Sequence, residues 1–117
     1  MYIYTFNQRG KSHVIKMIGC VEYKGHVSVI MPFFESVSIR DIVSSMKVQN
    51  VQFYFKSLFK ALKHIHSHNV IHRDIKPGNI LYDPLLNSFS VIDFGLAHYV
   101  CIIFNIKFLL IRKLGNV

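Results

Sequence analysis

The chain has 117 residues, of which 51% are hydrophobic and 17% charged, and its 14 Lys and Arg residues outnumber six Asp and Glu residues to give a net charge of +8. This composition suffices for one globular unit, and it excludes both a second full domain and a chain too polar to bury a core. The basic residues are scattered without a run of five or six, so the charge favours acidic or phosphorylated partners but predicts no direct nucleic-acid binding.

The cysteines and the apolar segments indicate in which kind of compartment the chain is expected and whether it crosses a membrane. Cys20 and Cys101 lie far apart and form neither a metal-binding pair nor a disulfide framework, which suits a reducing compartment. The apolar start MYIYTF is too short for a secretory signal and has no basic region before it. The stretch from Tyr99 to Ile111 has 13 residues and contains Asn105 and Lys107, whereas a membrane span needs about 20 apolar residues. We therefore expect no membrane span.

The first predicted elements are two short strands. Residues 14–18 and 26–31 are apolar and rich in β-branched residues, and a polar segment at residues 22–25 separates them. Pro32 closes the second strand because it has no backbone N–H to donate. The sequence therefore predicts an antiparallel hairpin.

Two helices are predicted next. A short helix over residues 38–46 has apolar residues at helical spacing, with Ser36 or Ser38 as its cap. A longer helix begins at Asn50 as the N-cap and ends at His68 and Asn69. Its two apolar stripes predict a helix buried inside a larger body rather than at a surface. The main stripe comprises Val51, Phe55, Leu58, Leu62 and Ile65, and the second comprises Tyr54, Phe59 and Ala61.

A compact loop and a second hairpin complete the predicted elements. The loop covers residues 70–79, and strands at 80–82 and 89–92 flank a turn at Asp83 and Pro84. The composition changes near Val100, since residues 94–117 contain no Ser, Thr, Asp or Glu.

Near the end of the long helix, His64 and His68 lie four residues apart and offer one face of a zinc site. No third ligand is near them in the sequence. A solvated helix terminus is therefore the favoured interpretation.

Two clusters of polar residues follow the long helix. The first is HRDIKPGN at residues 72–79, and the second is DFG at residues 93–95, which begins nineteen residues after Asp74. In this order and spacing the two clusters resemble the catalytic loop and the metal-binding loop of protein kinases. The resemblance implies an α+β fold, namely an incomplete protein-kinase fold with the end of the small lobe, the hinge and the start of the large lobe.

The resemblance also implies chemical roles. Asp74 would accept or orient the substrate hydroxyl proton, and Lys76 would place its ammonium near the transferred phosphate. Asn79 and Asp93 would give oxygen ligands to Mg²⁺, so the implied cofactors are ATP and Mg²⁺ and the implied partner is a protein substrate. Taken singly, Asp74 and Asp93 are also typical of a turn residue and a helix cap, and Asn79 of a side chain that bonds only to backbone.

The hinge of the resembling kinases corresponds to residues 31–35. The residues implied to bind the nucleotide are Met31, Pro32, Phe33, Phe34 and Leu81. Met31 would be the gatekeeper, Leu81 would pack beneath the purine, and Met17 would be a spine residue of the fourth strand. Core packing is the alternative for all three. His72 and Phe94 are expected to stack on each other rather than to do chemistry.

Within the protein kinases, MPFFESVSIRDIV and FKALKHIHSHNVIHRDIKPGNILYDPLLNSFSVIDFGLAH resemble the cell-division-cycle Ser/Thr kinases that trigger replication origins. The resemblance spans Val14 to His98, about three quarters of the chain. It implies a regulatory activating subunit and a nuclear location, with the cytoplasm as the alternative. It also implies a partial kinase domain at residues 1–98, with the hinge near 31–35, the catalytic loop at 72–79 and the metal loop at 93–95, followed by a divergent apolar tail at 99–117.

The sequence departs from the kinase pattern on both sides of these motifs. No GxGxxG precedes residue 14, no strand lysine has its usual context, and HYVCIIFNIKFLLIRKLGNV replaces an activation segment. We therefore expect a truncated or misassembled product that is weak or inactive alone, with the tail folded back over exposed core. The alternative is a non-catalytic binding module, or a decoy for a regulatory subunit.

Overall fold

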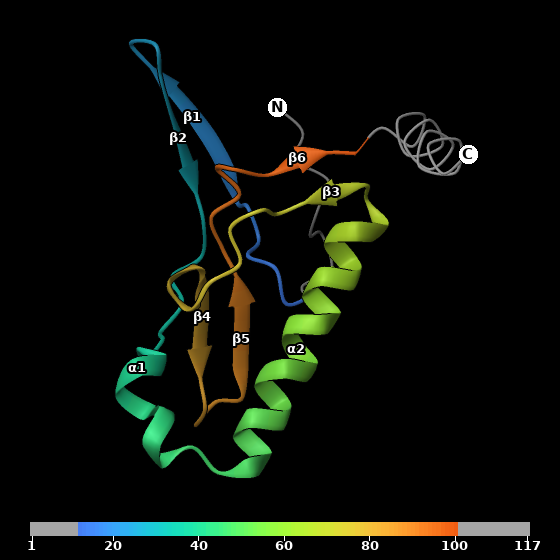
Figure 1. Cartoon of the computed structure of the whole chain (residues 1–117). Helices are drawn as coiled ribbons and strands as arrows, with labels where there is room; N and C mark the ends of the chain where they lie inside the picture. The colour runs from blue at the N-terminus through green and yellow to red at the C-terminus, as the bar shows by residue number, and fades with distance from the viewer. Residues whose placement is uncertain (1–11, 101–117) are drawn as a thin grey trace, which may run out of the picture.

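The computed structural model describes residues 12–100, which form three antiparallel strand pairs and one long helix (Figure 1). The elements in chain order are β1 (Gly19–Tyr23), β2 (His26–Ile30), α1 (Ile39–Ile42), the 3-10 turn η2 (Val43–Ser45), α2 (Val48–Ser67), β3 (Val70–Ile71), the 3-10 turn η3 (Pro77–Asn79), β4 (Ile80–Asp83), β5 (Ser88–Val91) and β6 (His98–Tyr99). The β1–β2, β3–β6 and β4–β5 pairs are separate two-stranded sheets. This mixture of hairpins and helices is the predicted α+β class. The predicted tail begins inside β6, and the predictions for Cys101, for residues 101–117 and for the start MYIYTF fall outside the described residues.

The β1–β2 hairpin projects away from the rest of the described chain (Figure 1). Tyr23 pairs with His26, so Lys24 and Gly25 alone form the turn, and their φ angles are 49° and 77°. Two positive φ angles give the mirror-image turn that matches the right-handed twist of paired strands. The turn is thus shorter than predicted. The prediction of a strand at residues 14–18 is wrong, because the first strand begins at Gly19 and Met17 lies before it.

Residues that precede β1 attach to β5 instead. Val14 forms a parallel bridge with Val91, and the Ile15 N–H donates to the Val91 carbonyl at 2.9 Å. The Val91 N–H donates in turn to the His13 carbonyl at 2.8 Å. Val14 is buried by this contact. Its apolar character therefore reflects packing at the edge of the β4–β5 pair, which explains the misplaced strand.

A linker without regular structure joins β2 to α1, and its Val37 N–H donates to the Tyr82 carbonyl at 2.9 Å. The predicted helix at 38–46 is split into one turn of α1 and the 3-10 turn η2. Ser38 takes the N-cap position without a side-chain capping bond. The Ser45 hydroxyl donates to the Ile42 carbonyl at 3.0 Å, and such a local bond competes with a continuing helix.

Helix α2 begins earlier than predicted. Lys47 occupies the N-cap position, and Asn50 is the third helical residue, whose Oδ1 accepts a hydrogen bond from the Lys47 N–H at 3.2 Å. Asn50 therefore caps the helix from inside its first turn. At the other end Asn69 has a φ of 57°, which is the left-handed conformation predicted for the end of this helix.

Only one face of α2 is buried. Tyr54, Ser57, Ala61 and Ile65 recur every three or four residues and are buried, and α2 runs alongside β5 (Figure 1). On the next face Phe59 is 65% exposed. The prediction of a helix enclosed within a larger body is therefore wrong for the described residues, because β4 and β5 cover one side of α2 and leave the other open. No helix within residues 12–100 has both the length and the hydrophobicity that crossing a bilayer requires.

The β4–β5 hairpin confirms the second predicted hairpin to within one residue at each strand end. Its turn is held by Asp83, whose Oδ1 accepts hydrogen bonds from the N–H groups of Leu85 and Leu86 at 2.7 and 3.2 Å. Tyr82 and Phe89 are cross-strand partners in this hairpin. The hairpin thereby presents an aromatic pair to α2.

The hydrophobic core lies between α2 and the β4–β5 hairpin. The Tyr54 ring meets Tyr82 and Phe89 edge to face, with centroid distances of 5.3 and 5.2 Å, a favoured geometry for aromatic pairs. Aliphatic side chains surround these rings. The buried hydrophobic residues are Val14, Tyr54, Ala61, Ile65, Val70, Ile80, Tyr82, Phe89 and Val91.

The end of α2 allows a stability test. Replacing Asn69 by Ala puts a Cβ-bearing residue without a compensating polar group at a φ of 57°, so we expect the free energy of unfolding to fall by about 1 kcal/mol. Asn69→Gly tolerates this φ and should change the free energy of unfolding by less. Urea denaturation followed by circular dichroism measures both. Equal losses for the two variants would contradict a conformational cause.

Candidate functional site

The catalytic-loop motif occupies the connection between β3 and η3. His72 is 1% exposed, its Nε2 lies 2.9 Å from the Ile92 carbonyl, and its Nδ1 lies 3.3 Å from the Asp74 backbone nitrogen. A carbonyl only accepts and a backbone N–H only donates, so these two contacts assign the donor role to Nε2 and the acceptor role to Nδ1. His72 thereby ties the catalytic loop to the residue that precedes Asp93.

A compact group of polar side chains lies at the centre of this loop. The Asp74 Oδ2 accepts hydrogen bonds from Lys76 Nζ and from Asn79 Nδ2, both at 2.8 Å. Asn79 Nδ2 also donates to the Asp74 carbonyl at 2.9 Å. The alternative that Asn79 bonds only to backbone is therefore wrong. Because its Nδ2 is directed at Asp74, the Asn79 Oδ1 is left without a hydrogen-bond donor among residues 12–100.

The charges of this group stabilise one another. The hydrogen bond from the Lys76 ammonium lowers the pKa of the Asp74 carboxyl below its ordinary value, and the Asn79 amide acts in the same direction. The same hydrogen bond, which Lys76 donates to Asp74, raises the pKa of Lys76, and the negative charge of Asp93 raises it further. Asp74 is therefore an ionised carboxylate at neutral pH.

The metal-loop motif lies next to this group. The Ile92 N–H donates to the Asn79 carbonyl at 3.0 Å, which fixes the residue before Asp93 against the catalytic loop. Asp93 has a φ of 61°, and its Oδ1 accepts a hydrogen bond from the Gly95 N–H at 3.1 Å. A Cβ at Gly95 would lie 3.1 Å from that Oδ1. Gly at position 95 therefore lets the loop fold closely over the carboxylate, because a Cβ here would push this oxygen aside by a few tenths of an ångström.

The two motifs are joined by further contacts that the sequence only partly predicts. The His72 and Phe94 rings lie 4.7 Å apart, which confirms their predicted packing. Arg73, which has a φ of 66°, donates from its Nε to the Leu96 carbonyl at 2.5 Å. The β3–β6 pair brings these segments together by pairing Val70 with Tyr99. The Arg73 contact has no local sequence signal because it joins residues 23 positions apart.

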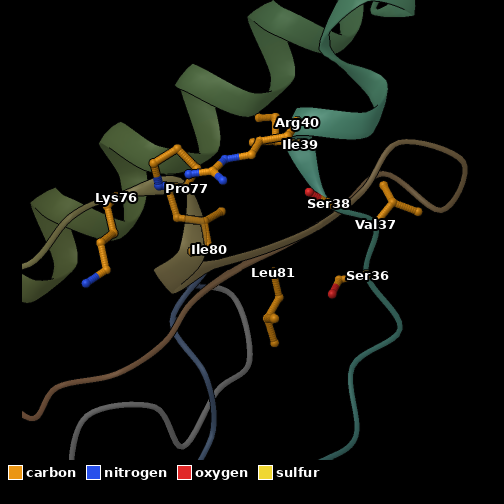
Figure 2. A pocket seen from close by; sticks show the side chains of 10 residues that line it. Ser36, Val37, Ser38, Ile39, Arg40, Lys76, Pro77, Ile80 and Leu81 are labelled. Atoms are coloured by element: carbon orange, nitrogen blue, oxygen red, sulfur yellow. The ribbon is translucent and has the colours of Figure 1, made fainter.

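A cavity of about 600 Å³ opens beside the catalytic loop (Figure 2). Its walls come from the linker before α1, from α1 itself, and from the loop and strand that follow Lys76. In Figure 2 the Arg40 side chain reaches from α1 toward Pro77. The lining residues are Ser36, Val37, Ser38, Ile39, Arg40, Lys76, Pro77, Gly78, Ile80 and Leu81.

Only one of the five predicted nucleotide-binding residues lies in the wall of this cavity. Leu81 lines the cavity, whereas the four hinge residues Met31, Pro32, Phe33 and Phe34 are not part of its lining. Phe33 is 94% exposed and Met31 is 49% exposed. The sequence did not predict that Ser36, Ser38 and Arg40 line this cavity. Ser36 lies in the linker, Ser38 at the N-cap of α1 and Arg40 within α1, and none of these positions indicates a pocket.

The donor set fits a hard cation with few protein ligands. The Asn79 Oδ1 and the second carboxylate oxygen of Asp93 have no hydrogen-bond partner within residues 12–100, and Mg²⁺ prefers such oxygens together with phosphates and water. In the same part of the chain no three His, Cys, Asp or Glu side chains gather closely enough to hold a metal by themselves. The His64 and His68 rings meet edge to face with their centroids 4.6 Å apart, and no third zinc ligand accompanies them in the described segment.

The Asp74–Lys76 pair permits a direct test. In Lys76→Met the main cause of the low Asp74 pKa is removed, so the pKa of Asp74 should rise toward its ordinary value of 3.8. Because folding lowers this pKa, the pair stabilises the fold at neutral pH, and that contribution disappears as the pH falls through the lowered pKa. Carbon-13 NMR titration of the carboxyl measures the change. Lys24→Met at the hairpin turn is the control, and an unchanged Asp74 pKa in Lys76→Met would contradict the assignment.

Comparison with known proteins identifies the class to which this fold and site belong. The model of the protein kinase domain matches residues 3–101, and the chain belongs to the protein kinase family.

The similar proteins are named as cell division cycle or cell cycle kinases. The chain is 46% identical over 88 residues to the probable serine/threonine-protein kinase cdc7 of Dictyostelium discoideum, and 42% identical over 88 residues to the cell division cycle 7-related protein kinase of Homo sapiens. It is 35% identical over 91 residues to the cell cycle protein kinase spo4 of Schizosaccharomyces pombe. These matches cover 75%, 75% and 78% of the chain but 8%, 15% and 21% of the relatives. The chain thus spans a minor part of the length of each relative.

Proposed function

We propose that this chain carries the catalytic centre of a Ser/Thr protein kinase, which transfers the γ-phosphate of ATP to a protein hydroxyl. The observation that supports the proposal is the hydrogen-bonded group of Asp74, Lys76 and Asn79, with Asp93 held beside it through the bond between Ile92 and Asn79. Phosphoryl transfer requires positioning and charge neutralisation more than covalent chemistry. A carboxylate, an ammonium and two oxygen ligands in one place meet that requirement.

Each side chain has a defined task in this proposal. Asp74 is the proton acceptor for the substrate hydroxyl, because its lowered pKa keeps it ionised at neutral pH. Lys76 carries a positive charge at the same pH and orients the phosphate that is transferred. Asn79 fixes the Asp74 carboxylate through Nδ2. His72 and Arg73 hold the two loops together from behind.

Asn79 and Asp93 are the residues that would hold Mg²⁺, which supplies neutralisation of the phosphate charges when it is bound. The cavity beside Leu81 is the proposed place for the nucleotide, with Arg40 and Lys76 as cationic groups in its wall. Met31, Pro32, Phe33 and Phe34 remain the proposed hinge contacts for the adenine. The 117 residues contain no Gly-rich loop of the GxGxxG type, so we expect slow transfer by this chain alone.

The cellular role proposed here follows the names of the relatives. Similarity to cell division cycle and cell cycle kinases supports a role in cell-cycle control, and we extend this to DNA replication in the nucleus. A regulatory activating subunit is the proposed partner. A protein with accessible Ser or Thr hydroxyls is the proposed substrate.

The experiment for the proposed activity is transfer of radiolabelled γ-phosphate to a protein substrate by the purified chain. We expect incorporation that requires Mg²⁺ and that ends when EDTA is added. Incorporation that survives EDTA, or that occurs on Tyr rather than on Ser or Thr, would contradict the proposal.

A non-catalytic binding module is the second candidate, and the exposed β1–β2 hairpin favours it. Every residue from Val21 to Ile30 is exposed, including Val27 and Val29, and exposed apolar surface of this kind marks interaction sites. Copurification with a regulatory subunit, lost in Val27→Lys but retained in Leu85→Lys, together with no phosphate incorporation, would favour this candidate over the enzyme.

A further inference from the structure

We propose that His13 is a protonation-sensitive latch, which holds residues 12–15 against α2 and β5 while its ring is neutral and releases them when the ring gains a proton. His13 lies before the first described strand and has no role in the proposed phosphate transfer. The inference concerns a response of the fold to pH and goes beyond the proposed kinase activity.

The His13 ring lies in an aromatic contact between α2 and β5. Its centroid is 6.4 Å from that of Phe53 on α2 and 6.0 Å from that of Phe89 on β5, with interplanar angles of 82° and 78°. Both contacts are edge to face, a geometry that aromatic pairs favour. His13 is half-buried in this position. The surroundings of the ring therefore suit a neutral imidazole and disfavour a charged ring that has lost part of its water.

The backbone beside this ring is attached to β5. The Val91 N–H donates to the His13 carbonyl at 2.8 Å, and the Ile15 N–H donates to the Val91 carbonyl at 2.9 Å. Val14 lies between these two bonds, is 4% exposed and belongs to the hydrophobic core. His13 has a φ of 57°, a left-handed conformation that His adopts more readily than most residues. Residues 13–15 thus bind the edge of β5 through their backbone and contact α2 through the His13 ring.

The charges near His13 oppose its protonation. Burial lowers the pKa of His13 below its ordinary value of 6.5, the positive charge of Lys60 lowers it further, and a hydrogen bond with the Phe89 backbone acts in the opposite direction. Lys60 lies seven residues after Phe53, on the same side of α2. Strand β5 carries no charged residue, and the segment that contains His13 contributes Lys16, a further positive charge.

The other titratable groups of this aromatic cluster do not compensate for a charge on His13. Burial raises the pKa of Tyr54 and of Tyr82 above the ordinary value of 10.0, so both are neutral between about pH 5 and pH 8. Asp83 lies next to Tyr82, and its carboxylate accepts hydrogen bonds from its own turn. The groups that shift the pKa of His13 include no carboxylate. A proton on His13 would therefore meet positive charge without a neutralising partner.

The direction of the response follows from this pKa. The ring regains water when the segment is released, so the released state binds a proton more readily than the latched state. The contribution of the latch is therefore complete above pH 6.5 and is lost as the pH falls through the lowered pKa of His13. Val91 lies between β4 and residues 13–15, and β5 leads to Asp93. Release thus frees one edge of the strand that precedes the metal-loop motif.

Hydrogen exchange of the full chain, followed by NMR, tests the proposal without measuring phosphate transfer. The amides of Ile15 and Val91 form the two backbone bonds of the latch. We expect their protection, relative to the unfolded rate at each pH, to fall at least about threefold between about pH 7.5 and pH 5.0. In His13→Asn, which tolerates the positive φ and does not titrate in this range, the protection should no longer depend on pH. The matched control, His26→Asn, changes an exposed His of β2 and should keep the dependence.

A second variant leaves the His13 ring in place. Lys60→Met removes an exposed positive charge that lowers the pKa of His13, so the midpoint of the loss of protection should move to higher pH. Lys24→Met at the β1–β2 turn should leave the midpoint unchanged. Protection of Ile15 and Val91 that is equal at both pH values in the wild-type chain would overturn the proposal. A pH dependence that survives in His13→Asn, or a midpoint that Lys60→Met does not move, would overturn it as well.

Discussion

Asp74→Asn should lower the rate of phosphate transfer by about 10²- to 10⁴-fold, the usual contribution of a positioned proton acceptor. The substitution is isosteric, and one side-chain oxygen remains to accept a hydrogen bond from Lys76 or Asn79, so the loop should keep its shape. What is lost is the carboxylate, whose pKa the Lys76 hydrogen bond holds low. The measurement is incorporation of radiolabelled phosphate under saturating ATP and Mg²⁺.

The matched control for this substitution is Asp83→Asn. Asp74 is half-buried and Asp83 is buried. The Asp83 Oδ1 accepts two backbone hydrogen bonds in the β4–β5 turn, outside the catalytic loop. An Asn oxygen accepts the same bonds, so transfer should stay close to the wild-type rate. A comparable loss in both variants, or retention of the wild-type rate in Asp74→Asn, would show that Asp74 is not the proton acceptor.

The polar group at the centre of the site could be predicted because its members are close in the sequence. Asp74, Lys76 and Asn79 lie within six residues, and the DFG motif marks Asp93 independently. The structure adds contacts that the spacing of these residues does not predict. It shows that Asn79 bonds to the Asp74 carboxylate as well as to its carbonyl, and that Arg73 reaches Leu96.

The cavity wall was beyond prediction for a physical reason. Arg40 lies on a one-turn helix, and its contribution to the wall depends on the linker bond between Val37 and the Tyr82 carbonyl. That bond joins residues 45 positions apart and leaves no periodic signal. At the hinge the sequence predicts a contact that the described structure does not contain. A strong resemblance at Met31 and Phe33 predicts contact with a nucleotide, while the described residues leave both side chains largely exposed.

The elements of the fold were predictable where local chemistry decides them. The Lys24–Gly25 turn, the stop at Pro32 and the left-handed Asn69 depend on residue type alone. Tertiary packing decides the rest. Val14 has the β-branched character of a strand residue, and it pairs with Val91 of a distant hairpin instead of with β2. Two apolar stripes on α2 predicted burial all round, but the neighbours of this helix cover only one of its faces.

Phe89→Ala should lower the free energy of unfolding by about 3–5 kcal/mol, as expected when a large aromatic side chain is deleted from a packed core. Phe89 is 5% exposed and has Tyr54, Tyr82 and His13 as ring neighbours at 5.2, 6.5 and 6.0 Å. A loss of this size is a large fraction of the total stability of a typical domain, about 5–15 kcal/mol. The variant should therefore unfold at a clearly lower urea concentration than the wild-type chain. Because β5 leads directly to Asp93, we expect the site to be lost with the hairpin.

The control for this last substitution is Phe33→Ala, which removes the same side chain from a position that is 94% exposed. Its free energy of unfolding should change by less than about 0.5 kcal/mol. Urea denaturation followed by far-ultraviolet circular dichroism compares the two midpoints. Similar midpoints for both variants would mean that the aromatic contacts between α2 and the β4–β5 hairpin do not stabilise the chain, and the arrangement of the core around Tyr54 and Tyr82 would have to be reconsidered.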